Sequence, residues 1–192
     1  MNTHRTIVIT FSTLDGVTQD PDGRDGTPIG GWLFRHGPEA VAGDKFELGP
    51  ILKTGVFVYG RKTWQAFSQL WPTRSDDFSA AMNQSTKLVA TRTLTDVSGW
   101  HNSTRLEGDP LAAIETHKAE RDVVIIGSAS LVRELVRQDR VDEYRISILP
   151  TVVGSGTRLF EGLAAPRDMR LVSVEKKGAA ALLRYERAAA TM

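Results

Sequence analysis

Short runs of apolar and β-branched residues recur along the chain, and most are followed by a segment that reads as helical. The first run, Thr6–Thr13, lacks the polar alternation of a half-exposed strand, so it predicts a buried strand. Later runs predict strands at Val56–Tyr59, Lys87–Thr91 and Asp122–Ile126. The intervening segments predict helices at Pro38–Thr54, Asp76–Gln84, Asp109–Glu120 and Ser128–Gln138, with a short helix after Val58–Trp64.

The pattern changes in the C-terminal part of the chain. A strand is predicted at Val141–Leu149, followed by a glycine loop at Thr151–Arg158. Leu171–Glu175 and Ala181–Arg187 alternate around Lys177-Gly178 as the strands of a hairpin do. Alternating strands and helices, then antiparallel strands, predict a three-layer α/β domain with a mostly parallel sheet and an antiparallel edge. One domain over residues 1–192 is expected, because no repeat or linker is visible.

The segment from Asp15 to Gly31 is dense in glycine, aspartate and proline, a composition typical of a loop. It is too long for a simple connection between two elements. Long ordered loops of this kind often cover a functional site, so the segment is predicted to be a lid.

Composition excludes several classes of function. The net charge of the 192 residues is +1, which gives no general attraction for nucleic acid or an anionic membrane. The absence of cysteine excludes disulfides and cysteine nucleophiles, and the four histidines are too scattered to suggest a metal site. The N-terminal apolar run is too short for a signal peptide, and no stretch is long enough to span a membrane. We therefore expect a cytoplasmic protein without a metal ion.

The sequence VYGRKTW, Val58–Trp64, places a glycine, two cations and a hydroxyl where a strand passes into a helix. Gly60 allows close approach of a ligand, and the first N–H groups of a helix are unpaired. Arg61, Lys62 and Thr63 add charge and a hydroxyl, so the turn has the composition of a phosphate site. The alternative interpretation is a plain turn with solvated cations, and short motifs often match by chance.

A second strand-to-helix turn lies in VVIIGSASLVREL, Val123–Leu135. Its small residues would allow a flat ligand or a pyrophosphate to approach the backbone, or would simply cap a tight turn through Ser128 or Ser130. Two such turns at the carboxyl ends of strands are more informative than one, because ligands bind at that edge of open α/β sheets. Gly154–Arg158 resembles the start of a dinucleotide fingerprint, but Leu159 replaces the third glycine, so we interpret it as a loop.

Asp44 lies on the predicted helix Pro38–Thr54, in register with Val41, Leu48 and Ile51. This spacing places its carboxylate on an apolar stripe, where the pKa of an unpaired acid rises. Asp44 is therefore a candidate proton donor, and Glu47 is a second candidate nearby. The alternative is that the Asp44 side chain reaches water beside the glycine-weakened turns of the helix.

Taken in order, these segments resemble the dihydrofolate reductase-like superfamily, and within it the reductase domain of the bifunctional riboflavin-biosynthesis deaminase-reductase. STLDGVTQ (Ser12–Gln19) is similar to that branch's S-x-D-G segment, and VYGRKTW to the family's G-R-x-T-W turn. VVIIGSASL is similar to the family's I-G-G turn. DRVDEYRISILPTVVGSGTRLF (Asp139–Phe160) resembles a segment that plain dihydrofolate reductases lack, so it is the most specific of the four.

The resemblance implies that NADPH is the reductant and that a hydride passes to a C=N or C=O carbon. Thr91 and Arg92 lie at the positions where the family binds the 2′-phosphate of the adenosine. Trp32 lies at the hinge of the lid. Trp32 and Asp44 are implied in substrate binding. The residues implied in cofactor binding are Thr10, Phe11, Asp15, Gly60, Arg61, Lys62, Thr63, Thr91, Arg92, Ile126, Gly127, Ser128, Ala129, Ser130 and Leu131.

The same resemblance bears on Asp44 and on the substrate. In dihydrofolate reductases an acid on the first helix binds the pterin ring, 16 residues before the glycine of the G-R-x-T-W turn, as Asp44 lies before Gly60. The expected substrate is a small pyrimidine, pterin or related heterocycle, with the aminouracil reductase of the riboflavin pathway as the default activity. One alternative is dihydrofolate reduction, which Asp44 favours. The other is a non-catalytic NADPH sensor, since Ser128 replaces a family glycine and a deaminase half is absent. The family also leads us to expect a homodimer.

Overall fold

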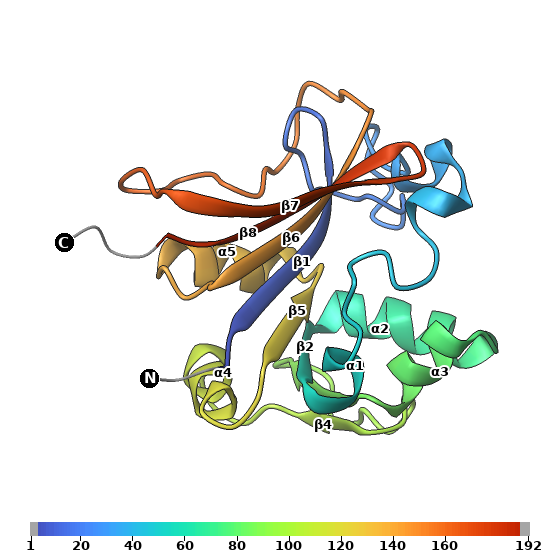
Figure 1. Ribbon diagram of the computed structural model, residues 1–192. Coiled ribbons are helices and arrows are strands. Elements are labelled where there is room, and N and C mark those ends of the chain that lie inside the picture. The colour runs from blue at the N-terminus through green and yellow to red at the C-terminus, as the bar shows by residue number, and fades with distance from the viewer. Residues whose placement is uncertain (1–3, 189–192) are drawn as a thin grey trace.

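An eight-stranded sheet forms the centre of the protein in the computed structural model, which describes residues 4–188 (Figure 1). In spatial order its strands are β4 (Ser103–Arg105), β3 (Thr86–Ala90), β2 (Val56–Gly60), β5 (Val123–Ile126), β1 (Thr6–Thr13), β6 (Glu143–Leu149), β8 (Ala180–Arg187) and β7 (Met169–Lys177). The strands from β4 to β6 are parallel to one another, whereas β8 and β7 are antiparallel to their neighbours. The predicted mostly parallel sheet with antiparallel C-terminal strands is confirmed.

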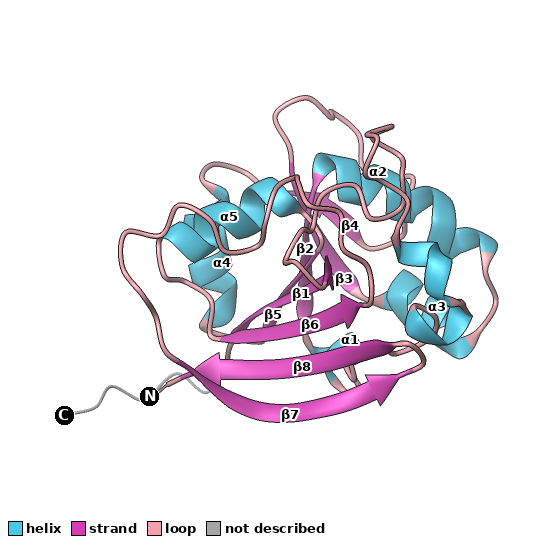
Figure 2. Cartoon of the chain, turned by 90° about the horizontal axis from the view of Figure 1, so that it is seen from above, coloured by secondary structure: helices cyan, strands magenta, loops and turns pink. Residues whose placement is uncertain are grey.

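Helices cover both faces of the sheet (Figure 2). On one face, α4 (Pro110–Lys118) and α5 (Ala129–Arg137) pack against Val8 and the residues that share its face. On the other, α1 (Ile51–Thr54), α2 (Arg61–Leu70) and α3 (Asp77–Gln84) pack over Ile7 and Ile9. Neighbouring residues of β1 therefore enter opposite halves of the core, which explains why the strand is apolar without alternation.

The long helix predicted over Pro38–Thr54 is wrong. The chain instead forms 3-10 turns at Leu33–His36 and Pro38–Ala40. Only the last four residues of the predicted helix, Ile51–Thr54, are helical, and they form α1. Gly43, Glu47 and Gly49 have φ values of 69°, 54° and 50°, in the left-handed region, which a right-handed helix cannot contain. The apolar spacing in this segment serves packing of the individual turns rather than one helical stripe.

The remaining helix and strand predictions agree with the structure to within two residues at most ends. Asp76 and Asp109 accept hydrogen bonds from backbone N–H groups of α3 and α4, as helix caps do. The sequence did not predict β4, a three-residue polar strand, or the 3-10 turn at Trp71–Thr73. No helix within residues 4–188 has the length and apolar character needed to cross a membrane.

A charged cluster replaces apolar packing on one face of β6. Glu143 is fully buried, and its carboxylate contacts Arg145 Nε at 2.6 Å, Arg184 Nε at 2.8 Å and Arg5 Nη1 at 2.5 Å. Arg145 Nη1 also donates to the carbonyl oxygens of Phe46 and Glu47, at 2.7 and 2.6 Å. Burial alone would raise the pKa of Glu143. Hydrogen bonds from Arg145 and Arg184 and the charges of Arg145 and Arg5 outweigh this effect and hold the pKa below its usual value. The cluster thereby fixes the turn that precedes α1 to the sheet.

Candidate functional site at the carboxyl edge of the sheet

The carboxyl ends of the parallel strands lie at one edge of the sheet, where the chain passes from β2 into α2 and from β5 into α5. These two turns are in direct contact. The N–H of Gly60 donates to Ser128 Oγ at 2.9 Å, and the N–H of Ser128 donates to Thr63 Oγ1 at 3.0 Å. The two glycine turns that the sequence singled out thus form one structural unit.

Both helices begin at this edge without a side-chain cap. The N–H groups of Arg61, Lys62 and Thr63 in α2, and those of the first turn of α5, therefore have no partner within their helix. Helix N-termini also carry a partial positive charge. Two such ends side by side form an environment that suits an anion.

Three cations surround this edge. Arg61 is exposed and donates to Gln65 Oε1 at 3.2 Å, while Lys62 Nζ pairs with Asp25 Oδ1 at 2.7 Å. Gly60 is paired with Ala90 in the β2–β3 register, so Thr91 and Arg92 follow directly beside the start of α2. Arg92 is exposed, whereas the hydroxyl of Thr91 accepts from the N–H groups of Thr93 and Leu94.

The other predicted cofactor residues differ in what they can offer a ligand. Phe11 and Ile126 are half-buried, and the ring of Phe11 lies edge-on to Phe46 with 5.0 Å between centroids. Thr10 is 9% exposed and its hydroxyl donates to the carbonyl of Phe11. Leu131 packs in the core, so only its backbone can contact a ligand. Gly127 is half-buried beside Thr63, and Ala129 and Ser130 are exposed.

Asp15 serves as a tether between two distant segments. Its carboxylate accepts from the Thr13 hydroxyl at 2.6 Å and from the N–H groups of Val153 and Gly154 at 3.3 and 2.9 Å. The hydrogen bond from Thr13 lowers the pKa of Asp15. Val17 forms a bridge with Arg158 in the same region. The first part of the predicted lid is thus attached to the loop that follows β6.

The rest of the lid is organised around Asp20, a buried carboxylate. One oxygen accepts from the N–H of Asp25 at 2.9 Å, and the other accepts from the N–H and the hydroxyl of Thr27 at 2.9 and 2.8 Å. Burial alone raises the pKa of Asp20, but these hydrogen bonds lower it below its usual value. The ordered loop carries Asp25 to Lys62, so the lid contacts the start of α2 through an ion pair.

Three residues predicted to act on the substrate are engaged elsewhere. Asp44 lies in a turn rather than on a helix, and its two oxygens accept from the N–H groups of Leu48 and Gly49 at 2.8 and 2.9 Å. Glu47 pairs with Lys177 at 2.6 Å. Trp32 is 0% exposed and donates to the carbonyl of Gln19, so its ring offers no surface to a ligand. The functional roles of these three residues remain predictions. The role of Asp44 was inferred from its place on a helix, and the structure has no helix there.

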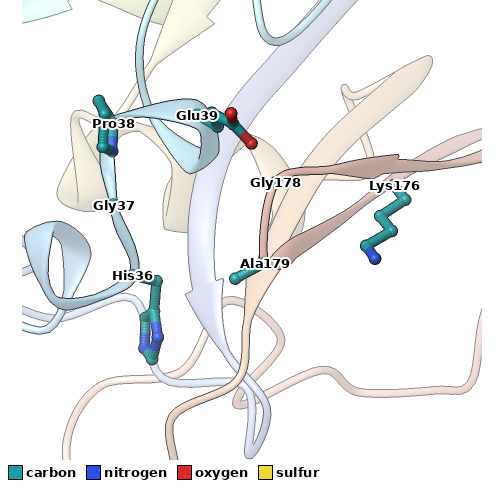
Figure 3. Close-up of a pocket in the computed structure, with 7 residues that line it drawn as sticks. All are labelled: His36, Gly37, Pro38, Glu39, Lys176, Gly178 and Ala179. Carbon is teal, nitrogen blue, oxygen red and sulfur yellow. The ribbon is translucent and has the colours of Figure 1, made fainter.

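Two cavities were not foreseen from the sequence. One of about 400 Å³ lies where the segment 36–39 meets the tip of the β7–β8 hairpin, with His36, Glu39 and Lys176 at its walls (Figure 3). The other, of about 510 Å³, lies along α5 and is lined by Ser130, Arg133, Glu134, Arg137, Glu161 and Gly162. Each cavity is lined by residues that lie more than 25 positions apart in the sequence, so no local sequence pattern could reveal it.

The sheet order and the paired turns define a protein with the dihydrofolate reductase-like fold, in the form found in reductase domains of riboflavin biosynthesis. The model of the RibD C-terminal domain family matches residues 5–183. The chain therefore belongs to the RibD C-terminal domain family, as the resemblance predicted.

Similar proteins include two curated sequences from Bacillus subtilis strain 168. The uncharacterized protein YwjB is 37% identical over 67 residues, which cover 35% of this chain and 38% of YwjB. The uncharacterized protein YyaP is 25% identical over 123 residues, or 60% of this chain and 64% of YyaP. The matched regions thus span less than two thirds of either relative.

Solved structures support the fold. A putative riboflavin biosynthesis protein from Shewanella sp. PV-4 superposes with a TM-score of 0.71 at 21% identity, over 96% of this chain and 99% of that one. RibD from Acinetobacter baumannii gives 0.65 at 18% identity, over 98% and 59%. A diaminohydroxyphosphoribosylaminopyrimidine deaminase/5-amino-6-(5-phosphoribosylamino)uracil reductase from Thermotoga maritima gives 0.61 at 13% identity, over 96% and 57%.

Proposed function

We propose that the protein is an NADPH-dependent reductase that delivers a hydride to a pyrimidine- or pterin-type heterocycle. The default substrate is the 5-amino-6-(5-phosphoribosylamino)uracil in the name of the Thermotoga maritima protein. The observation that carries the proposal is the direct contact of the Gly60–Thr63 and Gly127–Leu131 turns at the carboxyl edge of the sheet. Membership of a reductase-related family supports the broader assignment to the oxidoreductases.

The residues at this edge fit the charges of NADPH. The N–H groups that begin α2 and α5, with Arg61 and Lys62, would hold the pyrophosphate. Arg92 would hold the 2′-phosphate, because a guanidinium matches the geometry of phosphate oxygens. Thr10 and Phe11, in the second half of β1, would orient the nicotinamide. When bound, NADPH supplies the hydride, and the protein supplies binding and orientation.

The proton that accompanies the hydride needs a donor. Asp44 and Glu47 remain our candidates for that role, and each would first have to leave its present partners. Asp44 would release the N–H groups of Leu48 and Gly49, and Glu47 would release Lys177. A movement of the turn at 44–49 is therefore part of the proposal for proton transfer.

Two alternatives have specific support. Dihydrofolate reduction is favoured by the position of Asp44 relative to Gly60. A non-catalytic NADPH sensor is favoured by the engagement of Asp44 and Glu47 in structural contacts. Tight NADPH binding without reduction of any pterin, pyrimidine or flavin precursor would identify the sensor.

The first test is a fluorescence titration of the purified protein with NADPH and, separately, with NADH. Trp64 lies in α2 directly after the proposed phosphate turn, so binding should change its emission. We expect the dissociation constant for NADPH to be lower than that for NADH by a factor of about ten or more, because NADPH makes one additional charge-assisted contact through its 2′-phosphate. Absence of binding for both dinucleotides would contradict the proposed function. Substrate candidates would then be screened by the loss of NADPH absorbance.

We also propose that the protein forms a homodimer through its C-terminal strands. The edge strand β7 exposes the side chains of Leu171, Val172 and Val174, and exposed apolar edges favour pairing with another chain. Light scattering should give twice the chain mass for the wild type and the monomer mass for Val174→Lys. Val152→Lys, at a valine in a loop that is 67% exposed against 57% for Val174, is the control and should leave the mass unchanged. A monomeric wild type would contradict the dimer.

A further inference from the structure

Ser128 occupies the contact between the two strand–helix turns, at the base of the proposed cofactor site. It is 7% exposed and has φ 49° and ψ 48°, in the left-handed region. Residues other than glycine adopt this conformation at a cost of about 1–2 kcal/mol. The backbone strain and the burial indicate that the side chain has a specific task.

The hydrogen bonds of Ser128 indicate what this task is. Its hydroxyl donates to the carbonyl of Ile126 at 3.1 Å and accepts from the N–H of Gly60 at 2.9 Å. A hydroxyl has a single proton to donate, so that of Ser128 is already used. The Ser128 hydroxyl therefore cannot donate to a phosphate, although it belongs to the turn where phosphates are expected.

The backbone of Ser128 acts on Thr63. The N–H of Ser128 donates to Thr63 Oγ1 at 3.0 Å. Within residues 4–188, this is the hydrogen bond in which the Thr63 hydroxyl takes part. Because Thr63 Oγ1 is the acceptor in this bond, its proton is left for an acceptor outside the protein. Thr63 is half-buried at the first turn of α2, where an anionic ligand would bring such an acceptor.

We propose that Ser128 is a positioning residue, which locks the two turns together and directs the proton of the Thr63 hydroxyl toward a pyrophosphate. This inference rests on the proposed cofactor site and refines it. The N–H of Gly60 is not available to a phosphate, because it donates to Ser128 Oγ. Thr63 and the first-turn N–H groups of α2 and α5 become the donors that contact the ligand.

A double-mutant cycle on ligand affinity tests the proposal, with NADPH and inorganic pyrophosphate as probes. Thr63→Val removes the proton donor at nearly constant shape and should weaken both probes about tenfold or more. Ser128→Gly removes the hydroxyl that accepts from the Gly60 N–H, but it keeps the backbone N–H that donates to Thr63 and suits the left-handed backbone. The fold should therefore persist, while the loosened contact between the turns weakens the binding of both probes by about threefold or more. The double variant should bind no more weakly than Thr63→Val, because Ser128 acts through Thr63.

Two further variants separate positioning from general stability. Thr63→Ser keeps the hydroxyl and should restore most of the affinity lost in Thr63→Val. Ser128→Ala removes the hydroxyl but keeps the backbone strain, so it should lower the melting temperature more than Ser128→Gly and weaken the probes at least equally. Two results would overturn the role of Ser128. One is a loss of affinity in the double variant equal to the product of the losses in Thr63→Val and Ser128→Gly, and the other is wild-type affinity in Ser128→Gly.

The outcomes for the wild type distinguish this inference from the proposed function. Binding of pyrophosphate without a preference for NADPH would reject the reductase while the cycle still decides the role of Ser128. Binding of NADPH with independent effects of the two substitutions would reject only the positioning role. Failure to bind either probe would overturn both.

Discussion

Replacement of Arg92 with alanine should weaken the binding of NADPH by about ten- to a hundredfold and leave that of NADH nearly unchanged. Arg92 follows β3 at the carboxyl edge of the sheet, beside the start of α2, and its side chain is exposed. A guanidinium there meets the one phosphate by which the two dinucleotides differ. The affinities are measured by the same titration that tests the wild type.

Arg140→Ala is the matched control for this prediction. Arg140 lies between α5 and β6, at the opposite edge of the sheet from the proposed site, and is also partly exposed. Its removal changes the net charge equally and should not affect either affinity. An equal loss for NADPH and NADH in Arg92→Ala would exclude contact with the 2′-phosphate.

Replacement of Glu143 with glutamine should lower the free energy of unfolding by about 3–5 kcal/mol. The carboxylate is fully buried among Arg5, Arg145 and Arg184, and the neutral amide would leave these charges uncompensated. Urea unfolding followed by circular dichroism measures the loss. Glu120→Gln, at a largely exposed acid, is the control and should change stability by less than about 0.5 kcal/mol. Similar losses in the two variants would contradict the structural importance of the cluster.

The same cluster predicts how stability depends on pH. The pKa of Glu143 in the folded protein lies below its ordinary value of 4.5, because hydrogen bonds and charges from the arginines outweigh the effect of burial. A depressed pKa contributes stability that is fully present above the unfolded value and is lost as the pH falls through the folded one. The difference in stability between the wild type and Glu143→Gln should therefore be constant near neutral pH and shrink below about pH 4.5.

Much of the fold follows from local patterns. The apolar run of β1 and the caps at Asp76 and Asp109 are explicit in the sequence, since burial and helix capping depend on neighbouring residues. The spacing of Pro38–Thr54 predicts a helix that does not form, because residues with positive φ interrupt this segment. A glutamate in the left-handed region, such as Glu47, has no reliable signature in a single sequence.

The candidate site was predictable in outline but not in its contacts. Glycine turns after strands are visible in the sequence, and their convergence follows from a parallel sheet. The bond between Gly60 and Ser128 joins residues 68 positions apart, and that between Asp25 and Lys62 joins residues 37 apart. Such pairs are set by tertiary packing, so only the structure could reveal that the lid already contacts a cation of the site.

The central position of β1 has a consequence for the synthesis of the chain. Thr6 pairs with Val123, and Ile7 pairs with Glu143, so β1 has no neighbour in the sheet until more than a hundred further residues have followed. Contacts of such long sequence separation slow folding and leave apolar segments exposed in the meantime. On the ribosome, the apolar segment Thr6–Thr13 must therefore be kept from aggregating until β5 and β6 have been made.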